Sequence, residues 1–113
     1  LVERAAQNAA RNGIANAHFH VANLFEDQRG SDWARQPWDK LLLDPPRAGA
    51  DKLLEYLPHK QTRRVVYVSC HPASLARDAG ILVNQHGFTL KSAGVMDMFP
   101  HTAHVESIAL FER

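Results

Sequence analysis

Residues 65–78 read VVYVSCHPASLARD, and they place the only cysteine of the chain where a buried strand changes into a helix. The β-branched run at 65–68 is typical of a buried parallel strand. Pro72 suits the first turn of a helix, where its missing N–H costs nothing. A thiol at this junction would face the carboxyl edge of the sheet, where open α/β folds bind ligands, and the helix N-terminus would favour its thiolate. Cys70 is therefore the first candidate for chemistry, although a lone cysteine is more often a small buried hydrophobic residue.

The composition indicates one globular domain. The chain has 113 residues, 45% of them hydrophobic, which is enough for one real core. A single cysteine fits a reducing compartment, so we expect a cytoplasmic protein, and we expect no membrane partner because no apolar run is long enough to span a bilayer. Thirteen basic and twelve acidic residues give a net charge of +1, which argues against a strongly basic nucleic-acid module.

The first half of the chain predicts two helices and two strands. A helix over 1–13 ends at Asn12-Gly13, and its apolar pattern begins without a cap, so we expect the second part of a longer domain. The alternation at 17–21 and the apolar run at 40–43 predict strands, and Asp51 is the expected N-cap of a helix over 52–57.

The second half completes an α/β pattern. The Cys70 strand and the Pro72 helix, which Gly87 should stop, are followed by two expected strands at 88–95 and 104–111. This order predicts a mostly parallel sheet with an antiparallel edge.

Polar residues follow the strands of this expected sheet. Asn23, Asp44 (in DPPR, 44–47) and Cys70 come at three strand ends, and PHTAHVES at 100–107 brings Glu106 to the start of the last strand. Each has an ordinary structural explanation alone, but carboxyl ends of parallel strands meet at one crevice. Together they predict an active site.

A zinc site is a weaker interpretation of the same region. The spacing HTAH at 101–104 and the pair Cys70-His71 supply ligand types. However, no paired CxxC or HExxH spacing accompanies them, so we expect no metal.

Three motifs carry a resemblance to a known family: LLLDPPRAGA at 41–50, VYVSCHPASLARD at 66–78 and MDMFPHTAHVESIALF at 96–111. With them the chain resembles the C-terminal catalytic part of the bacterial RNA uracil-C5 methyltransferases, most closely those that act on 23S ribosomal RNA. The resemblance implies a Rossmann-like, S-adenosylmethionine-dependent methyltransferase fold. In this chain that fold would be N-terminally truncated, with its first strands and Gly-rich donor loop absent, so that 1–113 are the second part of the catalytic domain.

The resemblance also implies a mechanism. Cys70 would add to uracil C6, C5 would accept a methyl group from S-adenosylmethionine, and Glu106 would remove the C5 proton. Asn23 and Asp44 would lie in the donor site, and Arg47 would hold Cys70 or a phosphate. The implied partner is ribosomal RNA with the target base turned out of its helix.

The chain departs from the family pattern in two ways. His71 stands where the family usually has Asn, and Ser74 where it has Thr. The family's RNA-binding domain is absent, so an iron–sulfur cluster is expected only in that N-terminal part. We therefore expect the isolated chain to be inactive and to pair or dimerise through exposed strand edges.

Three alternatives remain at this point. One is a uracil-C5 methyltransferase of tRNA, and another is a non-catalytic α/β binding module, which would lack a reactive Cys70. The third is an amino-group methyltransferase, suggested by the DPP turn alone, which needs neither Cys70 nor Glu106.

Overall fold

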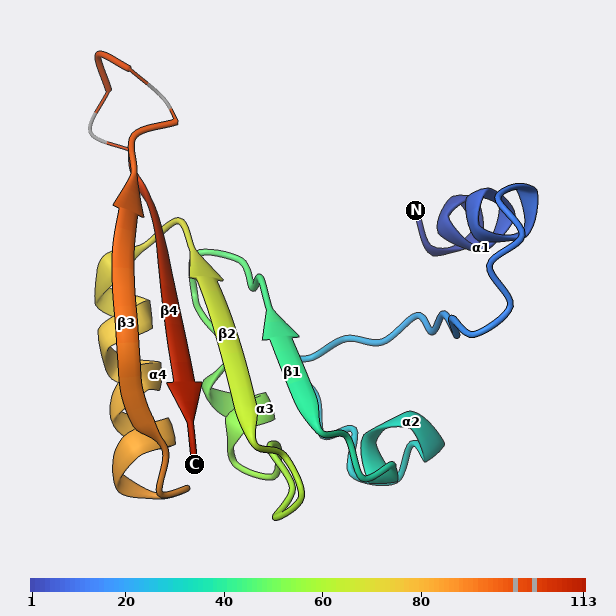
Figure 1. Cartoon of the computed structure of the whole chain (residues 1–113), viewed down its shortest axis with the longest axis horizontal. Coiled ribbons are helices and arrows are strands. Elements are labelled where there is room, and N and C mark those ends of the chain that lie inside the picture. The colour runs from blue at the N-terminus through green and yellow to red at the C-terminus, as the bar shows by residue number, and fades with distance from the viewer. Residues whose placement is uncertain (99, 103) are drawn as a thin grey trace.

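The computed structural model describes residues 1–98, 100–102 and 104–113. Four strands form one sheet in the order β1-β2-β4-β3 (Figure 1): β1 (Lys40–Leu43), β2 (Arg64–Ser69), β3 (Thr89–Met96) and β4 (Glu106–Glu112). β1 and β2 are parallel, whereas β4 runs antiparallel to both of its neighbours. The α/β class is confirmed. The expected antiparallel edge is present as the pair of β3 and β4, and because β4 lies between β2 and β3, only β1 and β2 form a parallel pair.

Two helices pack on one face of this sheet, α3 (Asp51–Leu54) and α4 (Pro72–Asn84). α4 begins at Pro72 and stops before Gly87, whose φ of 73° is the left-handed conformation expected after a helix. The β2 side chains alternate, with positions 65, 67 and 69 buried toward the helices. The fully buried apolar side chains of the core come from both layers: Leu54, Val65, Tyr67, Leu82 and Phe111.

Helix α3 is shorter than the sequence predicts. It ends at Leu54 rather than at 57, and Leu57 precedes Pro58, a position that disfavours helical backbone. Its N-cap is Ala50, which corrects the prediction of Asp51. Asp51 instead lies in the first turn, where a negative charge favours the helix dipole.

The strand predicted at 17–21 is wrong, since the structure has no strand there and these residues are exposed. Alternating side chains define the two faces of a strand but not its partner, and β1 pairs only with β2 among the described residues. The preceding helix, α1 (Val2–Arg11), forms as predicted but contacts no other described helix or strand (Figure 1). The short helix α2 (Asp32–Arg35) lies in the following loop.

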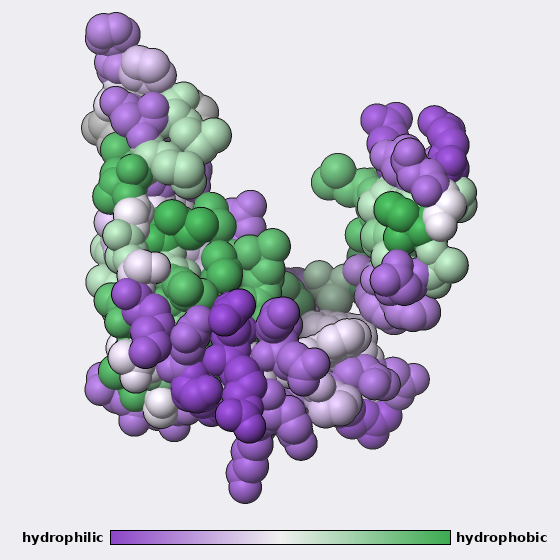
Figure 2. All heavy atoms as spheres, viewed as in Figure 1, coloured by the Kyte–Doolittle hydropathy of each residue, from purple (hydrophilic) through white to green (hydrophobic). Residues whose placement is uncertain are grey.

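The second face of the sheet is apolar and is not covered by a described helix. Leu42 of β1 is 71% exposed and Ile108 of β4 is 37% exposed. Figure 2 views this face and shows hydrophobic side chains gathered over the sheet, with hydrophilic ones at the end where β2 begins. None of the described helices is long and apolar enough to cross a membrane.

A Leu→Ala substitution should lower the free energy of unfolding by different amounts on the two faces of the sheet. Leu54→Ala is expected to lower the free energy of unfolding by about 2–5 kcal/mol, because it leaves a cavity in the core. Leu42→Ala is the matched control and should change it by less than about 0.5 kcal/mol. Urea denaturation of the chain measures both values, and equal effects would contradict the assignment of the core.

Candidate active site

The pairing of β2 with β4 brings Cys70 and Glu106 together. Ser69 lies opposite Ser107 in this antiparallel ladder, so Cys70, one residue beyond β2, lies beside Glu106, the first residue of β4. Both residues line one cavity of about 320 Å³, together with Thr102, His104 and Val105. The Cys70 side chain is exposed, which contradicts the interpretation of a buried hydrophobic cysteine. The structure thus places a thiol and a carboxylate at one opening.

A tight turn holds the backbone on both sides of Cys70. The Ser69 hydroxyl donates to the His71 carbonyl oxygen at 2.9 Å, and the His71 N–H donates back to Ser69 Oγ at 3.0 Å. Ser69 is buried, and both of these hydrogen bonds are partly buried. The side chain between them is therefore presented on a fixed backbone.

The His71 side chain, which departs from the family pattern, is also engaged. Its Nδ1 lies 2.8 Å from Ser74 Oγ, and that hydroxyl donates to the Arg47 carbonyl oxygen at 2.6 Å. Because the one proton of the hydroxyl is donated to the Arg47 carbonyl, Nδ1 is the donor to Ser74 Oγ. Ser74 thus supplies the hydroxyl that links Cys70's neighbour to the loop after β1.

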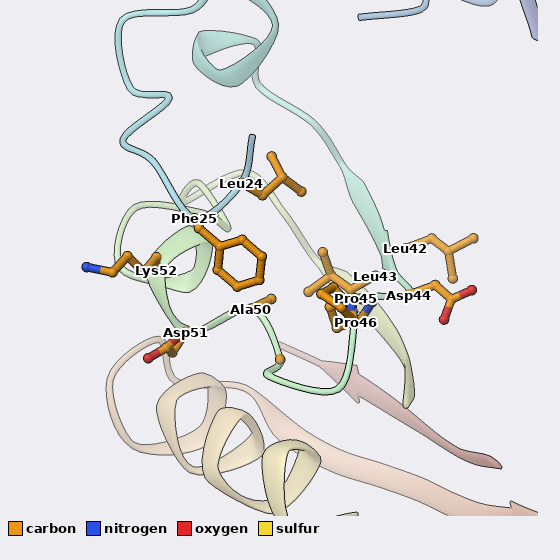
Figure 3. A pocket seen from close by; sticks show the side chains of 11 residues that line it. Leu24, Phe25, Leu42, Leu43, Asp44, Pro45, Pro46, Ala50, Asp51 and Lys52 are labelled. Carbon is orange, nitrogen blue, oxygen red and sulfur yellow. The ribbon is translucent and has the colours of Figure 1, made fainter. Parts of the chain in front are cut away.

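Asp44 follows β1 and lines a second cavity, of about 190 Å³. Most of the lining is apolar, and Figure 3 shows the Phe25 ring directed toward the cavity and the Asp44 carboxylate directed away from that ring. Leu43 is level with Tyr67 in the parallel pair, so Asp44 and Cys70 lie at the same edge of the sheet. A flat apolar group would suit this lining.

Asn23 does not line either cavity. Its Oδ1 accepts the N–H of Phe25 at 3.0 Å, which closes a local turn, and its side chain is exposed. This turn brings the next two residues, Leu24 and Phe25, into the Asp44 cavity. A donor-binding role of Asn23 stays a prediction.

Several lining residues could not be predicted from the sequence. Phe25 and Leu24 follow no regular pattern, because they enter the cavity from an irregular loop. Thr102 and Val105 lie inside the PHTAHVES segment, so their proximity to Glu106 in the sequence was the available signal. Among the described ranges, no three His, Cys, Asp or Glu side chains are placed to hold a metal ion.

Comparisons with known proteins agree on one type of protein. A family profile described as tRNA (Uracil-5-)-methyltransferase matches residues 2–113. The chain is 69% identical to the 23S rRNA (uracil(1939)-C(5))-methyltransferase RlmD of Stenotrophomonas maltophilia (strain K279a), and 68% identical to that of Xanthomonas axonopodis pv. citri (strain 306). Each match covers the whole chain and 26% of the relative, so the chain spans about a quarter of the length of these proteins.

A solved structure is similar as well. It is the Pyrococcus abyssi tRNA (uracil-54, C5)-methyltransferase in complex with S-adenosyl-L-homocysteine, with a TM-score of 0.76 and 34% identity. The match covers 97% of this chain and 26% of that one. The fold described above is therefore also found in a methyltransferase of known structure.

Proposed function

We propose that this chain, which belongs to the tRNA (Uracil-5-)-methyltransferase family, supplies the uracil-methylating centre of an S-adenosylmethionine-dependent enzyme acting on 23S ribosomal RNA. The observation that carries the proposal is the shared cavity of Cys70 and Glu106. Methylation at uracil C5 needs a nucleophile at C6 and a base at C5, and two adjacent side chains of these types meet that need.

The reaction proceeds in four chemical steps. The Cys70 thiolate adds to C6 of the uracil, which makes C5 electron-rich. C5 then accepts the methyl group of S-adenosylmethionine, whose sulfur–methyl bond breaks so that S-adenosylhomocysteine leaves. Glu106 then takes the proton from C5, and the bond between Cys70 Sγ and C6 breaks to restore the uracil ring and the thiolate.

The Asp44 cavity suits the methyl donor chemically. Its apolar lining, which includes Phe25 and Pro45, suits the flat adenine ring, and the charged lining residues Asp44, Asp51 and Lys52 suit the polar groups of the donor. Asn23 would support this site through the turn that places Phe25. Asp44 and Cys70 lie at one edge of the sheet, which would bring the methyl group of S-adenosylmethionine close to the target uracil.

Ribosomal RNA is the favoured substrate over tRNA. The relatives named for 23S rRNA are 68–69% identical to this chain, whereas the tRNA enzyme of known structure is 34% identical. The target would be the uracil named for those relatives, turned out of its helix to reach Cys70. Such an enzyme would work in the cytoplasm, and its iron–sulfur cluster, if the relatives' remaining sequence supplies one, would lie outside this chain.

A hybrid enzyme tests the proposal directly. This chain replaces the matching residues of the Stenotrophomonas maltophilia relative, and the hybrid is incubated with S-adenosylmethionine and unmodified 23S rRNA or tRNA. We expect 5-methyluridine in the rRNA only, measured by mass spectrometry of its nucleosides. Methylated amino groups would favour the amino-group alternative, methylated tRNA would favour the other branch, and no methylation would favour a binding module.

The isolated chain is expected to be a poor catalyst. Helix α1 lies apart from the sheet and one sheet face is uncovered, so we expect at least a 100-fold lower rate than the hybrid, on the order of what misplaced groups cost. Dimerisation through the open edge of β1 is expected at high concentration. Methylation of 23S rRNA by this chain alone measures the first expectation, and a rate close to that of the hybrid would contradict it.

A further inference from the structure

Helix α4 holds the loop that follows β1 at three points. The Ser74 hydroxyl donates to the Arg47 carbonyl oxygen at 2.6 Å, and Arg77 Nη2 donates to the Ala48 carbonyl oxygen at 2.7 Å. Two residues further along the loop, the Ala50 N–H donates to Asp78 Oδ2 at 2.8 Å. In these three hydrogen bonds, the loop contributes backbone groups and the helix contributes side chains.

Asp78 is the centre of this arrangement. Its side chain is fully buried and accepts from three donors: the Ala50 N–H and the Tyr67 hydroxyl at Oδ2, and Arg77 Nε at Oδ1, 3.0 Å away. Burial, with the hydrogen bond to Asp78, raises the pKa of Tyr67, so its phenol keeps the proton that it donates. A buried carboxylate is stable only when it is paired and hydrogen-bonded in this way.

Gly49 shows how closely the loop approaches this network. Its φ of 84° is a conformation that glycine adopts readily, and a Cβ there would lie 2.5 Å from Arg77 Nη2 and 2.6 Å from Asp78 Oδ2. The position of the loop therefore depends on the position of these two side chains.

The same helix begins beside the nucleophile. α4 starts at Pro72, two residues after Cys70. The loop that α4 binds starts at Asp44, which lines the cavity proposed for S-adenosylmethionine. We propose that Asp78 is a positioning residue for methyl transfer. It fixes the loop at 44–50 relative to Cys70 without touching the substrate. This inference rests on the proposed function, and it adds a residue whose effect is on the alignment of the two reacting groups.

Asp78→Asn in the hybrid enzyme tests the inference. Asparagine has one acceptor oxygen for three donors, so the loop should shift. We expect a loss of about 10-fold to 100-fold in kcat and a rise of about 10-fold in KM for S-adenosylmethionine. The KM for RNA and the rate of Cys70 alkylation should change less than two-fold. The active fraction is counted through the covalent adduct with 5-fluorouridine RNA.

Two further variants separate positioning from folding. Tyr67→Phe removes one donor and leaves Asp78 two partners, so the same pattern is expected with a smaller effect. Asp32→Asn, at an exposed ion pair with Arg35, is the control and should change nothing. The inference is overturned if Asp78→Asn leaves kcat per active molecule and the KM for S-adenosylmethionine unchanged. It is also overturned if the rate of Cys70 alkylation falls by the same factor as kcat. A parent hybrid without methylation would instead refute the proposed function.

Discussion

Cys70→Ala is expected to abolish methyl transfer by the hybrid enzyme, with a loss of roughly 1000-fold or more in kcat, because no other group adds to C6. The exposed Cys70 thiol lines the same cavity as Glu106 and is the proposed nucleophile. RNA carrying 5-fluorouridine should trap it, since fluorine cannot leave C5 as a proton does. The measurement is a denaturation-stable adduct, mapped to Cys70 by mass spectrometry in the unmutated hybrid and absent in the variant.

Ser92→Ala is the matched control for this variant. It also removes one heavy atom, from an exposed position on β3, and should leave both the rate and the adduct intact. Methylation of uracil C5 by the Cys70→Ala variant at the normal rate would refute the covalent mechanism. An adduct that maps to another cysteine of the hybrid would show that the nucleophile is misassigned.

Glu106→Gln should stop the reaction at a later point. Addition of Cys70 and acceptance of the methyl group do not need the carboxylate, but removal of the C5 proton does. We therefore expect turnover to fall by about 100-fold to 10,000-fold while a covalent complex with ordinary, unfluorinated RNA accumulates. Gel electrophoresis under denaturing conditions measures this complex, and mass spectrometry should find the methyl group in it.

Glu112→Gln controls for the loss of a charge on the same strand. Glu112 lies at the other end of β4, paired with Arg64 at 3.0 Å, and its substitution should affect neither turnover nor the complex. If Glu106→Gln releases methylated RNA at the normal rate, another group removes the proton. If it forms no complex and no product, Glu106 acts before methyl transfer.

Local sequence signals predicted most of the elements. The β-branched run before Cys70 and the proline after it identify β2 and α4, since both signals act within a few residues. The alternation at 17–21 failed for the opposite reason, because a strand exists only with a partner and none of the described strands pairs with it. The insertion of β4 between β2 and β3 is likewise a property of distant pairings, which no local pattern reveals.

The site was predicted only in part, because some of its residues are marked by local signals and others are brought together by distant strand pairing. The strand-to-helix junction alone identified Cys70, whereas a role for Glu106 came from the resemblance. What joins them physically is the register of Ser69 with Ser107, thirty-eight residues apart in sequence. The Asp78 network could not be predicted, because an aspartate in a helix usually faces water and this one is buried by the approach of Gly49.

The place of β4 in the sheet has a consequence for synthesis. Ribosomes make chains from the N-terminus, so β1, β2 and β3 emerge before the strand that must enter between β2 and β3. Until then β2 lacks one neighbour, and the thiol at its end has no carboxylate beside it. A nascent chain therefore carries an accessible cysteine before the proposed base lies beside it, and on the proposed mechanism it could not release methylated RNA until β4 has been made.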